Sequence, residues 1–284
     1  MKQIQWYPGH MAKAMRLMEE NLTLCDAVLY VLDARAPASS FNPRLKKLAG
    51  QKSVLYLFNK ADTADGRADA LLERVQSGAK AVKLTATAPA QARMLQGAMS
   101  ELVKEKLDHN RERGVVKPVR LLVAGVPNTG KSTVINLLAG GKKAVTGDKA
   151  GVTKQKQWVR CGAFELLDTP GTMPPYFENQ TLARRLAYIG SINDDILAFD
   201  EIALSLLEEL SEKYPERLFE RYGIAGGTPM EMLDKVCARM GFMLRGNEYD
   251  YERGERALID DLRKGRLGKV CFDCEEDLKI TGLI

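Results

Sequence analysis

The chain contains an eight-residue segment, Gly125–Ser132, whose pattern G-x-x-x-x-G-K-S restricts the fold around it. This segment, the P-loop, follows an apolar run, Val119–Ala124, and precedes a helical pattern, Thr133–Ala139, that stops at Gly140. A glycine-rich loop between a strand and a helix directs backbone N–H groups and the positive helix end at a phosphate. The P-loop therefore predicts an α/β fold that binds a nucleotide at the carboxyl edge of its sheet.

Three other short apolar runs also end at a polar residue. They are Ala27–Leu32 before Asp33, Val54–Phe58 before Asn59, and Phe164–Leu167 before Asp168. Runs that do not alternate with polar residues are typical of strands buried on both faces, as in a parallel sheet covered by helices. Helical patterns such as Ala64–Gln76 and Gln91–Leu107 lie between the runs. This alternation predicts an α/β domain over residues 1–176.

The run that ends at Asp168 continues as Asp-Thr-Pro-Gly, a D-x-x-G pattern. Asp168 would hold Mg²⁺ through water, and Gly171 would bring a backbone N–H close to the γ-phosphate. The pattern alone is common in turns, but in a chain where it follows a P-loop it indicates the residues that contact Mg²⁺ and the γ-phosphate. Lys131 would reach the β- and γ-phosphates, and Ser132 would bind Mg²⁺. The phosphate-binding residues predicted from the two motifs are Asn128, Thr129, Gly130, Lys131, Ser132, Thr133 and Gly171.

An N-K-x-D pattern at residues 59–62 indicates which base is bound. The carboxylate of Asp62 accepts two hydrogen bonds side by side, which matches the N1–H and N2–H₂ donors of guanine. Adenine offers an acceptor at N1 and would leave this charge unpaired, which is costly. Asn59 would bond the base or brace the P-loop, and the stem of Lys60 would cover a ring face. Backbone N–H groups at Thr85 and Ala86, in the base loop, would lie near the guanine O6.

The order of these motifs differs from that of ordinary GTPases, which run P-loop, switch threonine, D-x-x-G, N-K-x-D and base loop. Here N-K-x-D at 59–62 and the base loop at 85–87 precede the P-loop, Thr153 and D-x-x-G. Domain termini usually lie close together, so joining them and opening a surface loop preserves a fold. The polar stretch 104–120 lies where that joint must be. After permutation, the residues that follow Gly171 are attached directly to the D-x-x-G switch, so a shift that depends on the γ-phosphate would be transmitted to them.

After Tyr176 the strand signals stop and five helical patterns follow. They are Thr181–Ile189, Asp195–Leu210, Pro215–Tyr222, Pro229–Met240 and Glu255–Lys264. Thr228 and Glu231 form a capping-box pattern at the start of the fourth helix. The glycines that follow three of these patterns are suitable helix stops: Gly223, Gly241 and Gly265. We therefore predict a second, all-helical domain over residues 177–284.

Composition restricts the class of protein. The chain has 284 residues, 45% apolar and 28% charged, as in folded proteins of two domains. Its five cysteines, an odd number, do not fit a secreted disulfide framework. The apolar runs are too short to span a membrane, and the N-terminus shows no charged-then-apolar leader. We expect a cytoplasmic protein that does not bind a membrane.

The chain resembles the circularly permuted GTPases of the bacterial ribosome biogenesis GTPase A family. Besides the permuted motifs, the resemblance rests on Gln5–Ala14, Arg185–Ala187, Tyr251–Gly254 and Arg263–Gly268. It implies a circularly permuted Ras-like P-loop GTPase domain followed by a smaller all-α domain. It also implies that the protein binds GTP and GDP, and that it binds the immature large (50S) ribosomal subunit through ribosomal RNA in late assembly. The early start of the family motif leaves little room for a transit peptide and favours the bacterial branch.

The resemblance also assigns roles in hydrolysis. Ser132, Thr153 and Asp168 would handle Mg²⁺, and Lys131, Thr153 and Gly171 would act at the γ-phosphate. The residue after D-x-x-G, a glutamine in Ras-like GTPases, is Thr172, whose short hydroxyl predicts slow intrinsic hydrolysis. The family points to His10 as the group that positions water once the subunit is bound, stimulating hydrolysis. The alternative is a structural histidine held by its aromatic neighbours.

Asn128 stands at a P-loop position that, in similar GTPases, accompanies a bound K⁺. The ion adds positive charge beside the phosphates without an arginine finger. The resemblance therefore implies K⁺ as a second metal cofactor, with Asn128 as its ligand. The alternative is a loop asparagine that bonds its own backbone.

The net charge of +5 divides unevenly. Residues 177–284 hold 15 basic and 22 acidic residues, so residues 1–176 hold 27 and 15. We therefore expect the first domain to supply much of the attraction to RNA, in a salt-sensitive way. The basic run Arg263–Lys269 is either a solvated helix face or a second RNA contact.

Weaker patterns have simpler interpretations. Cys271 and Cys274 form half a zinc site at most, and we expect free thiols. Met11, Met15 and Met18 have near-helical spacing that favours packing over a partner groove. Two other functions remain compatible with the sequence: a nucleotide-gated RNA-binding scaffold with incidental hydrolysis, and a GTPase acting on another RNA particle. No oligomer is implied.

Overall fold

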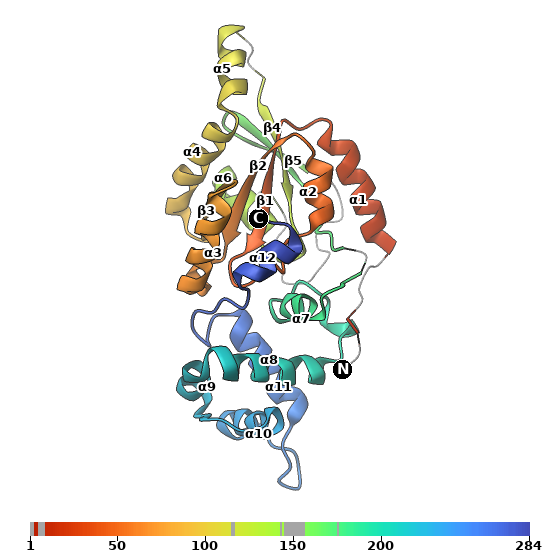
Figure 1. The fold of residues 1–284 in the computed structure, drawn as a ribbon, viewed down its shortest axis with the longest axis vertical. Coiled ribbons are helices and arrows are strands. Elements are labelled where there is room, and N and C mark those ends of the chain that lie inside the picture. The colour runs from red at the N-terminus through yellow and green to blue at the C-terminus, as the bar shows by residue number, and fades with distance from the viewer. Residues whose placement is uncertain (1–2, 5–8, 115–116, 143, 145–156, 175) are drawn as a thin grey trace.

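A six-stranded sheet organises the first part of the chain in the computed structural model, which describes residues 3–4, 9–114, 117–142, 144, 157–174 and 176–284 (Figure 1). The strands are β1 (Ala27–Asp33), β2 (Ser53–Asn59), β3 (Lys80–Lys83), β4 (Val119–Ala124), β5 (Gln157–Cys161) and β6 (Phe164–Asp168). Their order in the sheet is β3-β2-β1-β4-β6-β5. Every neighbouring pair is parallel except β5 and β6, which form a hairpin. The predicted α/β class is confirmed.

The register of the sheet brings the carboxyl ends of the central strands together. Asp33 at the end of β1 lies opposite Asn59 at the end of β2. Asp168 at the end of β6 lies opposite Val123, two residues before the P-loop begins. Parallel strands end at a common edge, so motifs that are far apart in the sequence meet there.

Helices cover both faces of the sheet. They are α1 (Gly9–Leu22), α2 (Pro43–Ala49), α3 (Gly66–Gln76), α4 (Ala92–Leu102), α5 (Lys104–Glu112) and α6 (Lys131–Ala139). Alternate β1 residues enter two separate apolar clusters: Tyr30 packs with α1, α2 and α3, and Leu29 packs with α4 and α6. The α5 helix has no buried residue and extends away from the body at the top of Figure 1. It forms within the stretch 104–120, predicted to be the permutation joint.

The helices after the sheet form a second packing unit, here called the helical region. They are α7 (Gln180–Tyr188), α8 (Phe199–Lys213), α9 (Pro215–Tyr222), α10 (Pro229–Met240) and α11 (Tyr251–Arg263). The predicted capping box of Thr228 and Glu231 is present at the start of α10. Gly223 and Gly241 end α9 and α10 in the left-handed conformation, as expected. The cluster beneath these helices also contains Met11, Val126 and Met173, so the helical region packs directly on the sheet edge that carries the P-loop.

The end of the chain returns to the sheet. The last helix, α12 (Glu275–Thr281), packs against α3, and the C-terminus lies in front of β1 (Figure 1). Leu278 and Leu283 are buried in the cluster that contains Tyr30 of β1. The division at residues 176 and 177 remains a prediction, and this packing favours grouping the last helix with the sheet. Within the described ranges, no helix combines the length and apolarity needed to cross a membrane.

Candidate nucleotide site

Two glycines shape the P-loop between β4 and α6. Gly125 has φ 150° and Gly130 has φ 94°, both in the left-handed range that side chains disfavour. A Cβ on Gly125 would collide with the Val31 carbonyl oxygen, and one on Gly130 would collide with the Asn59 side-chain amide. Glycine is therefore required at these two positions for two reasons, the positive φ angles and the close approach of β1 and β2 residues to the loop.

Lys131, the first residue of α6, is buried beneath the P-loop, and its ammonium donates a hydrogen bond to the Val126 carbonyl oxygen at 2.8 Å. Burial lowers the pKa of Lys131 to about 8, although the nearby Asp168 opposes this shift. A phosphate group would favour the charged form and raise this pKa again. Lys131 is therefore placed to exchange a weak internal contact for a phosphate.

Ser132 and Asp168 lie together at the end of β6. The Ser132 hydroxyl donates to Asp168 Oδ2 at 3.0 Å, while Asp168 Oδ1 is buried without a hydrogen-bond partner. Burial raises the pKa of Asp168 above its usual range. A hydroxyl and a carboxylate with an unused oxygen are the hard donors that Mg²⁺ prefers. These two residues therefore fit the predicted Mg²⁺ site, whereas Thr153, the third predicted ligand, lies outside the described residues.

The D-x-x-G segment packs closely on the P-loop. A Cβ on Gly171 would lie 2.6 Å from Pro127 N and 2.7 Å from Pro127 Cα, so only glycine fits. The next residue, Thr172, is fully buried, and its hydroxyl has no hydrogen-bond partner. Its backbone is fixed on both sides, since its N–H donates to the Gly125 oxygen at 3.4 Å and its oxygen accepts from Asn42 Nδ2 at 3.3 Å. A short, buried side chain at this position agrees with the expectation of slow intrinsic hydrolysis.

Asn59 connects the P-loop to the base loop. Its Nδ2 donates to the Thr129 oxygen at 2.8 Å, and its Oδ1 accepts the Ala86 N–H at 3.0 Å. Of the two roles considered for Asn59, the structure shows the brace. The Thr85 N–H donates to Gln91 Oε1 at 2.7 Å, so the two base-loop amides predicted to face guanine both have protein partners.

Lys60 takes part in an ion cluster that the sequence did not reveal. Its ammonium lies 3.0 Å from Asp33 Oδ2 and donates to the Asn128 oxygen at 2.6 Å. Asp33 also pairs with the buried Arg35, at 2.7 Å. Burial opposes ionisation of Asp33, but Arg35 and Lys60 outweigh it and hold its pKa far below the usual range. The sequence signal that could have revealed this cluster is the pair Asp33 and Arg35, two opposite charges directly after the apolar run Ala27–Leu32. Asp62, the predicted base reader, is exposed on the same loop.

Arg35 extends this cluster to the helical region. Its Nη1 donates to the carbonyl oxygens of Leu262 and Arg263, both at 3.3 Å, at the end of α11. A guanidinium at a helix C-terminus donates to carbonyls that lack an intrahelical partner. Its positive charge also interacts favourably with the negative end of the helix dipole. The base-reading loop is thus connected to α11 through Lys60, Asp33 and Arg35.

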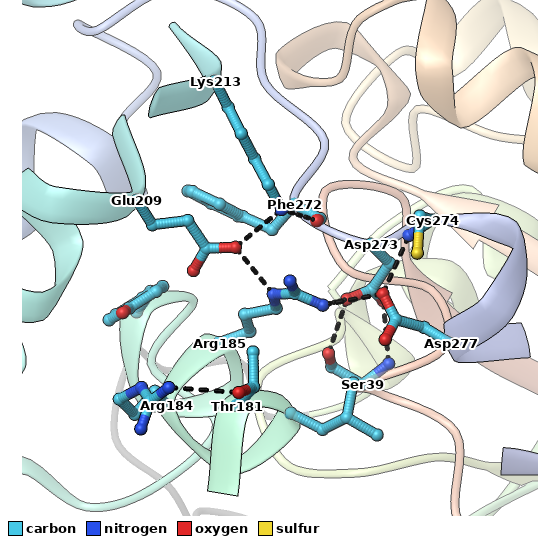
Figure 2. A network of polar contacts seen from close by, with 12 residues as sticks. Ser39, Thr181, Arg184, Arg185, Glu209, Lys213, Phe272, Asp273, Cys274 and Asp277 are labelled. Atoms are coloured by element: carbon cyan, nitrogen blue, oxygen red, sulfur yellow. Dashed lines mark hydrogen bonds and ion pairs between the residues drawn. The ribbon is translucent and has the colours of Figure 1, made fainter. Parts of the chain in front are cut away.

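A second cluster, around Arg185 of α7, joins the helical region to the end of the chain (Figure 2). Arg185 bonds Glu209 of α8 at 2.9 Å, Asp273 at 3.1 Å and Asp277 at 2.8 Å. Asp273 also accepts the backbone N–H and hydroxyl of Ser39, at 2.8 and 2.7 Å. All the charged groups are largely buried. Arg185, part of the stretch that resembles the ribosome biogenesis GTPase A family, therefore has a structural role here.

The other predicted positions are placed as follows. The backbone of His10 lies in the first turn of α1, but its side chain is outside the described residues. Asn128 Nδ2 donates to the Gly190 oxygen at 2.6 Å, so this P-loop residue is hydrogen-bonded to the helical region. Cys271 is a buried free thiol and Cys274 an exposed one. Met11 and Met18 are buried in the core, as expected for packing residues.

The basic run Arg263–Lys269 is largely ion-paired. Arg263 pairs with Asp194 at 2.7 Å, and Lys264 pairs with Asp260 at 2.9 Å. Arg266 pairs with both Asp260 and Asp261. The exposed side chains of Lys264 and Arg266 agree with a solvated helix face, the simpler of the two interpretations, whereas Arg263 joins α11 to Asp194. Contact between this run and RNA remains a prediction.

Known proteins with similar sequences and structures place this geometry in context. Residues 120–218 match a protein family described as 50S ribosome-binding GTPase. The ribosome biogenesis GTPase A of Bacillus cereus is 40% identical over 281 residues, which cover 96% of this chain and 95% of that protein. The mitochondrial ribosome-associated GTPase 1 of Mus musculus is 28% identical over 294 residues, covering 95% and 90%. The crystal structure of GNP-bound YlqF from T. maritima has a TM-score of 0.66 and 26% identity, covering 93% of this chain and 99% of that one.

Proposed function

The chain belongs to the ribosome biogenesis GTPase A family, and from this premise we propose that it acts on the immature large (50S) ribosomal subunit in late assembly. It is a GTPase of ribosome biogenesis with a circularly permuted P-loop fold. We propose further that it binds the subunit through ribosomal RNA and that the subunit stimulates GTP hydrolysis. The observation that carries this proposal is the match of residues 120–218, which hold the P-loop and D-x-x-G, to the 50S ribosome-binding GTPase family.

The site residues divide the work of binding GTP. Asp62 would read the guanine edge, the Lys60 stem would cover the ring, and Asn59 would hold the base loop beside the P-loop. Since the amides of Thr85 and Ala86 already have protein partners, we assign the guanine O6 contact to the next amide, that of Thr87, which lies in an exposed part of the base loop.

The phosphates would lie against the P-loop, with Lys131 as the counter-charge to the β- and γ-phosphates. Ser132 and Asp168, with Thr153, would hold Mg²⁺, the cofactor of GTPases, which neutralises charge on the phosphates when bound. The Gly171 N–H would face the γ-phosphate. Asn128 would hold K⁺, since its Nδ2 bond to Gly190 fixes the plane of the side-chain amide.

His10 is the proposed water-positioning group, because Thr172 is short and fully buried. His10 lies at the start of α1, and Met11, the next residue, packs in the same apolar cluster as Met173, which follows Thr172. The first turn of α1 and the residue after Thr172 thus share one apolar core. A neutral imidazole orients water near pH 7.

We assign the RNA-facing charge mainly to residues 1–176, here called the sheet region, in the cytoplasm where ribosomes are assembled. Lys264 and Arg266 of the helical region pair with Asp260 and Asp261, which reduces the charge they offer to a polyanion. The excess of basic residues lies in residues 1–176. Binding would weaken as salt rises, because each phosphate contact releases counterions.

The test of the 50S assignment is co-sedimentation with separated ribosomal subunits. We expect the protein to sediment with immature large subunits in the presence of a non-hydrolysable GTP analogue and to be released with GDP. Binding to the small subunit alone, or equal binding with both nucleotides, would contradict the proposal.

The competing scaffold function, with incidental hydrolysis, is tested by His10→Ala. The chain offers a matched control in its other histidine, His109, which is exposed on α5. We expect His10→Ala to abolish subunit-stimulated turnover and to block release, while His109→Ala behaves as wild type. Assembly that proceeds normally with His10→Ala would favour the scaffold.

A further inference from the structure

The helical region touches the P-loop at one tight corner, Gly190–Ser191, directly after α7. The Ser191 hydroxyl donates to the Pro127 carbonyl oxygen at 2.7 Å. In return, Asn128 Nδ2 donates to the Gly190 carbonyl oxygen at 2.6 Å. Ser191 is fully buried, so its bond to Pro127 is shielded from water, while the bond from Asn128 is partly buried. Two consecutive P-loop residues are therefore held from outside the nucleotide-binding fold.

The corner itself is fixed by Arg263 at the end of α11. The Arg263 guanidinium donates to the Tyr188 oxygen at 3.1 Å and to the Ala187 oxygen at 2.8 Å, both at the end of α7. It also forms a two-point ion pair with Asp194, at 2.7 Å. Gly190 has φ 77°, and a Cβ there would lie 3.1 Å from Arg263 Nε, so a glycine and an arginine fit against each other. A corner held in this way is a rigid support.

Three consecutive P-loop carbonyl oxygens each accept a hydrogen bond, and Ser191 supplies the first of the three donors. The Pro127 oxygen accepts from Ser191, the Asn128 oxygen from Lys60 Nζ, and the Thr129 oxygen from Asn59 Nδ2. Each donor is a side chain from another segment of the chain. In a planar trans peptide, the carbonyl of one residue and the N–H of the next point in opposite directions. Fixing the three carbonyls outward therefore turns the next three N–H groups toward the concave side of the loop, where a phosphate binds.

We infer that Ser191 is a positioning residue of the nucleotide site: through the Pro127 carbonyl it orients the Asn128 N–H toward the phosphates. Asn59 and Lys60 do the same for the next two N–H groups from the sheet side. The helical region is thus part of the nucleotide site itself and does not act only through the D-x-x-G switch. Because the P-loop contacts phosphates common to both nucleotides, the effect of Ser191 is the same for GDP and GTP. The inference concerns nucleotide binding alone and does not depend on the role on the large subunit.

The test compares Ser191→Ala with Ser205→Ala in the full chain without ribosomes. Ser205 is a matched control, since it is also buried in the helical region and its hydroxyl accepts from Tyr188 at 2.8 Å, away from the P-loop. Each variant loses one buried hydroxyl, so both should lose similar stability. We expect Ser191→Ala to raise the Kd for fluorescent GDP and for a GTP analogue three- to tenfold, equally for both, as for the loss of one hydrogen bond. Ser205→Ala should bind both as wild type.

A second pair of variants keeps the test decisive if Ser191→Ala does not fold. Arg263→Ala releases the corner, whereas Lys264→Ala removes a neighbouring charge that is exposed and pairs only with Asp260 among the described contacts. We expect weaker binding of both nucleotides with Arg263→Ala and unchanged binding with Lys264→Ala. Unchanged affinity in Ser191→Ala and Arg263→Ala, an equal loss in Ser205→Ala, or a loss confined to the GTP analogue would overturn the inference.

Discussion

Two of the junctions between the helical region and the sheet region have opposite chemistry. At the Arg185 junction, one buried guanidinium holds Glu209, Asp273 and Asp277, far from the P-loop in the sequence (Figure 2). At the P-loop junction, the contacts are uncharged hydrogen bonds between the Gly190–Ser191 corner and the loop. Both junctions start on α7 or directly after it, so a single helix carries the two kinds of contact.

The difference separates stability from nucleotide binding. Removing one member of a buried ion cluster leaves the remaining charges unpaired, which costs far more than the loss of a neutral hydrogen bond. The neutral bonds are weaker, but they act on the peptide planes that receive the phosphates. We therefore expect the strong junction to determine whether the chain folds and the weak one to determine how tightly it binds nucleotide.

The largest expected effect is that of Arg185→Ala. Without the guanidinium, the buried Asp273 and Asp277 lose their ion-pair partner, although Glu209 keeps Lys213 at 2.7 Å. We expect the free energy of unfolding to fall by about 3–5 kcal/mol. Urea denaturation would measure the loss. The neighbouring Arg184→Ala, whose side chain is only partly buried, should cost no more than about 1 kcal/mol. A loss below about 1 kcal/mol in Arg185→Ala would remove the contrast between the junctions.

The next effect concerns Asn59→Ala, on the sheet side of the P-loop. This change frees both the Thr129 oxygen and the Ala86 N–H, whereas Ser191→Ala frees one carbonyl. We expect nucleotide affinity to fall by roughly ten- to a hundredfold, more than for Ser191→Ala. Equilibrium titration with fluorescent GDP would measure it, and Asn110→Ala on α5 is the control. An effect smaller than that of Ser191→Ala would mean that the helical side dominates the support of the loop.

A change of pH should act on the P-loop through Lys131 and leave the Arg185 junction unchanged. The Lys131 pKa of about 8 in the free protein rises when phosphate binds, so binding above pH 8 requires uptake of a proton. Well below pH 8 both states carry the charge and affinity is constant; above pH 8 the affinity should fall by up to about tenfold per pH unit. Arg185 stays charged throughout this range, so the other junction should not respond.

Calorimetric titration with GDP in two buffers of different ionisation enthalpy would measure this proton uptake. Lys131→Arg is the control, because arginine remains charged and the decline between pH 8 and 9 should disappear. Equal proton uptake in the variant would assign the effect to another group.

The smallest expected effect is that of Arg74→Ala, which breaks an ion pair between α3 and Glu275 of α12 at 2.8 Å. The two side chains are 54% and 40% exposed, so solvent screens their attraction. We expect a loss of at most about 1 kcal/mol, which vanishes at high salt. Urea denaturation at low and high salt would measure it. A loss comparable to that of Arg185→Ala would show that burial is not what separates the two pairs.

The sequence predicted the inner strands well and the edge strands poorly. The runs chosen for β1, β2, β4 and β6 agree with the structure to within a residue at each end, because strands covered on both faces are continuously apolar. The two edge strands, β3 and β5, carry lysines or a glutamine and an arginine, so no such run marks them. The helix predicted over Gln91–Leu107 is interrupted at Val103, whose backbone (φ −116°, ψ 27°) is not helical and separates α4 from α5.

The site was predictable where its chemistry is local in the sequence. The P-loop, D-x-x-G and N-K-x-D are short motifs at strand ends, and the sheet brings them to one edge. Arg35 and Ser191 were missed, because their roles depend on contacts with residues far away, such as the 64 positions between Ser191 and Pro127. Arg263 was predicted as a surface or RNA-binding charge for the same reason, since its partners lie about 70 residues earlier in the chain.

The return of the chain end to the sheet has a consequence for how the protein is made. Leu278 and Leu283 are buried with residues of β1 and β2, which are synthesised first. The central strand β4 also enters the sheet after β3, between β1 and a strand that is translated later still. On a translating ribosome, the early strands must therefore wait with an open edge and an uncovered apolar face. The core of this ribosome-assembly GTPase closes only when Leu278 and Leu283 have left the exit tunnel of the ribosome that made it.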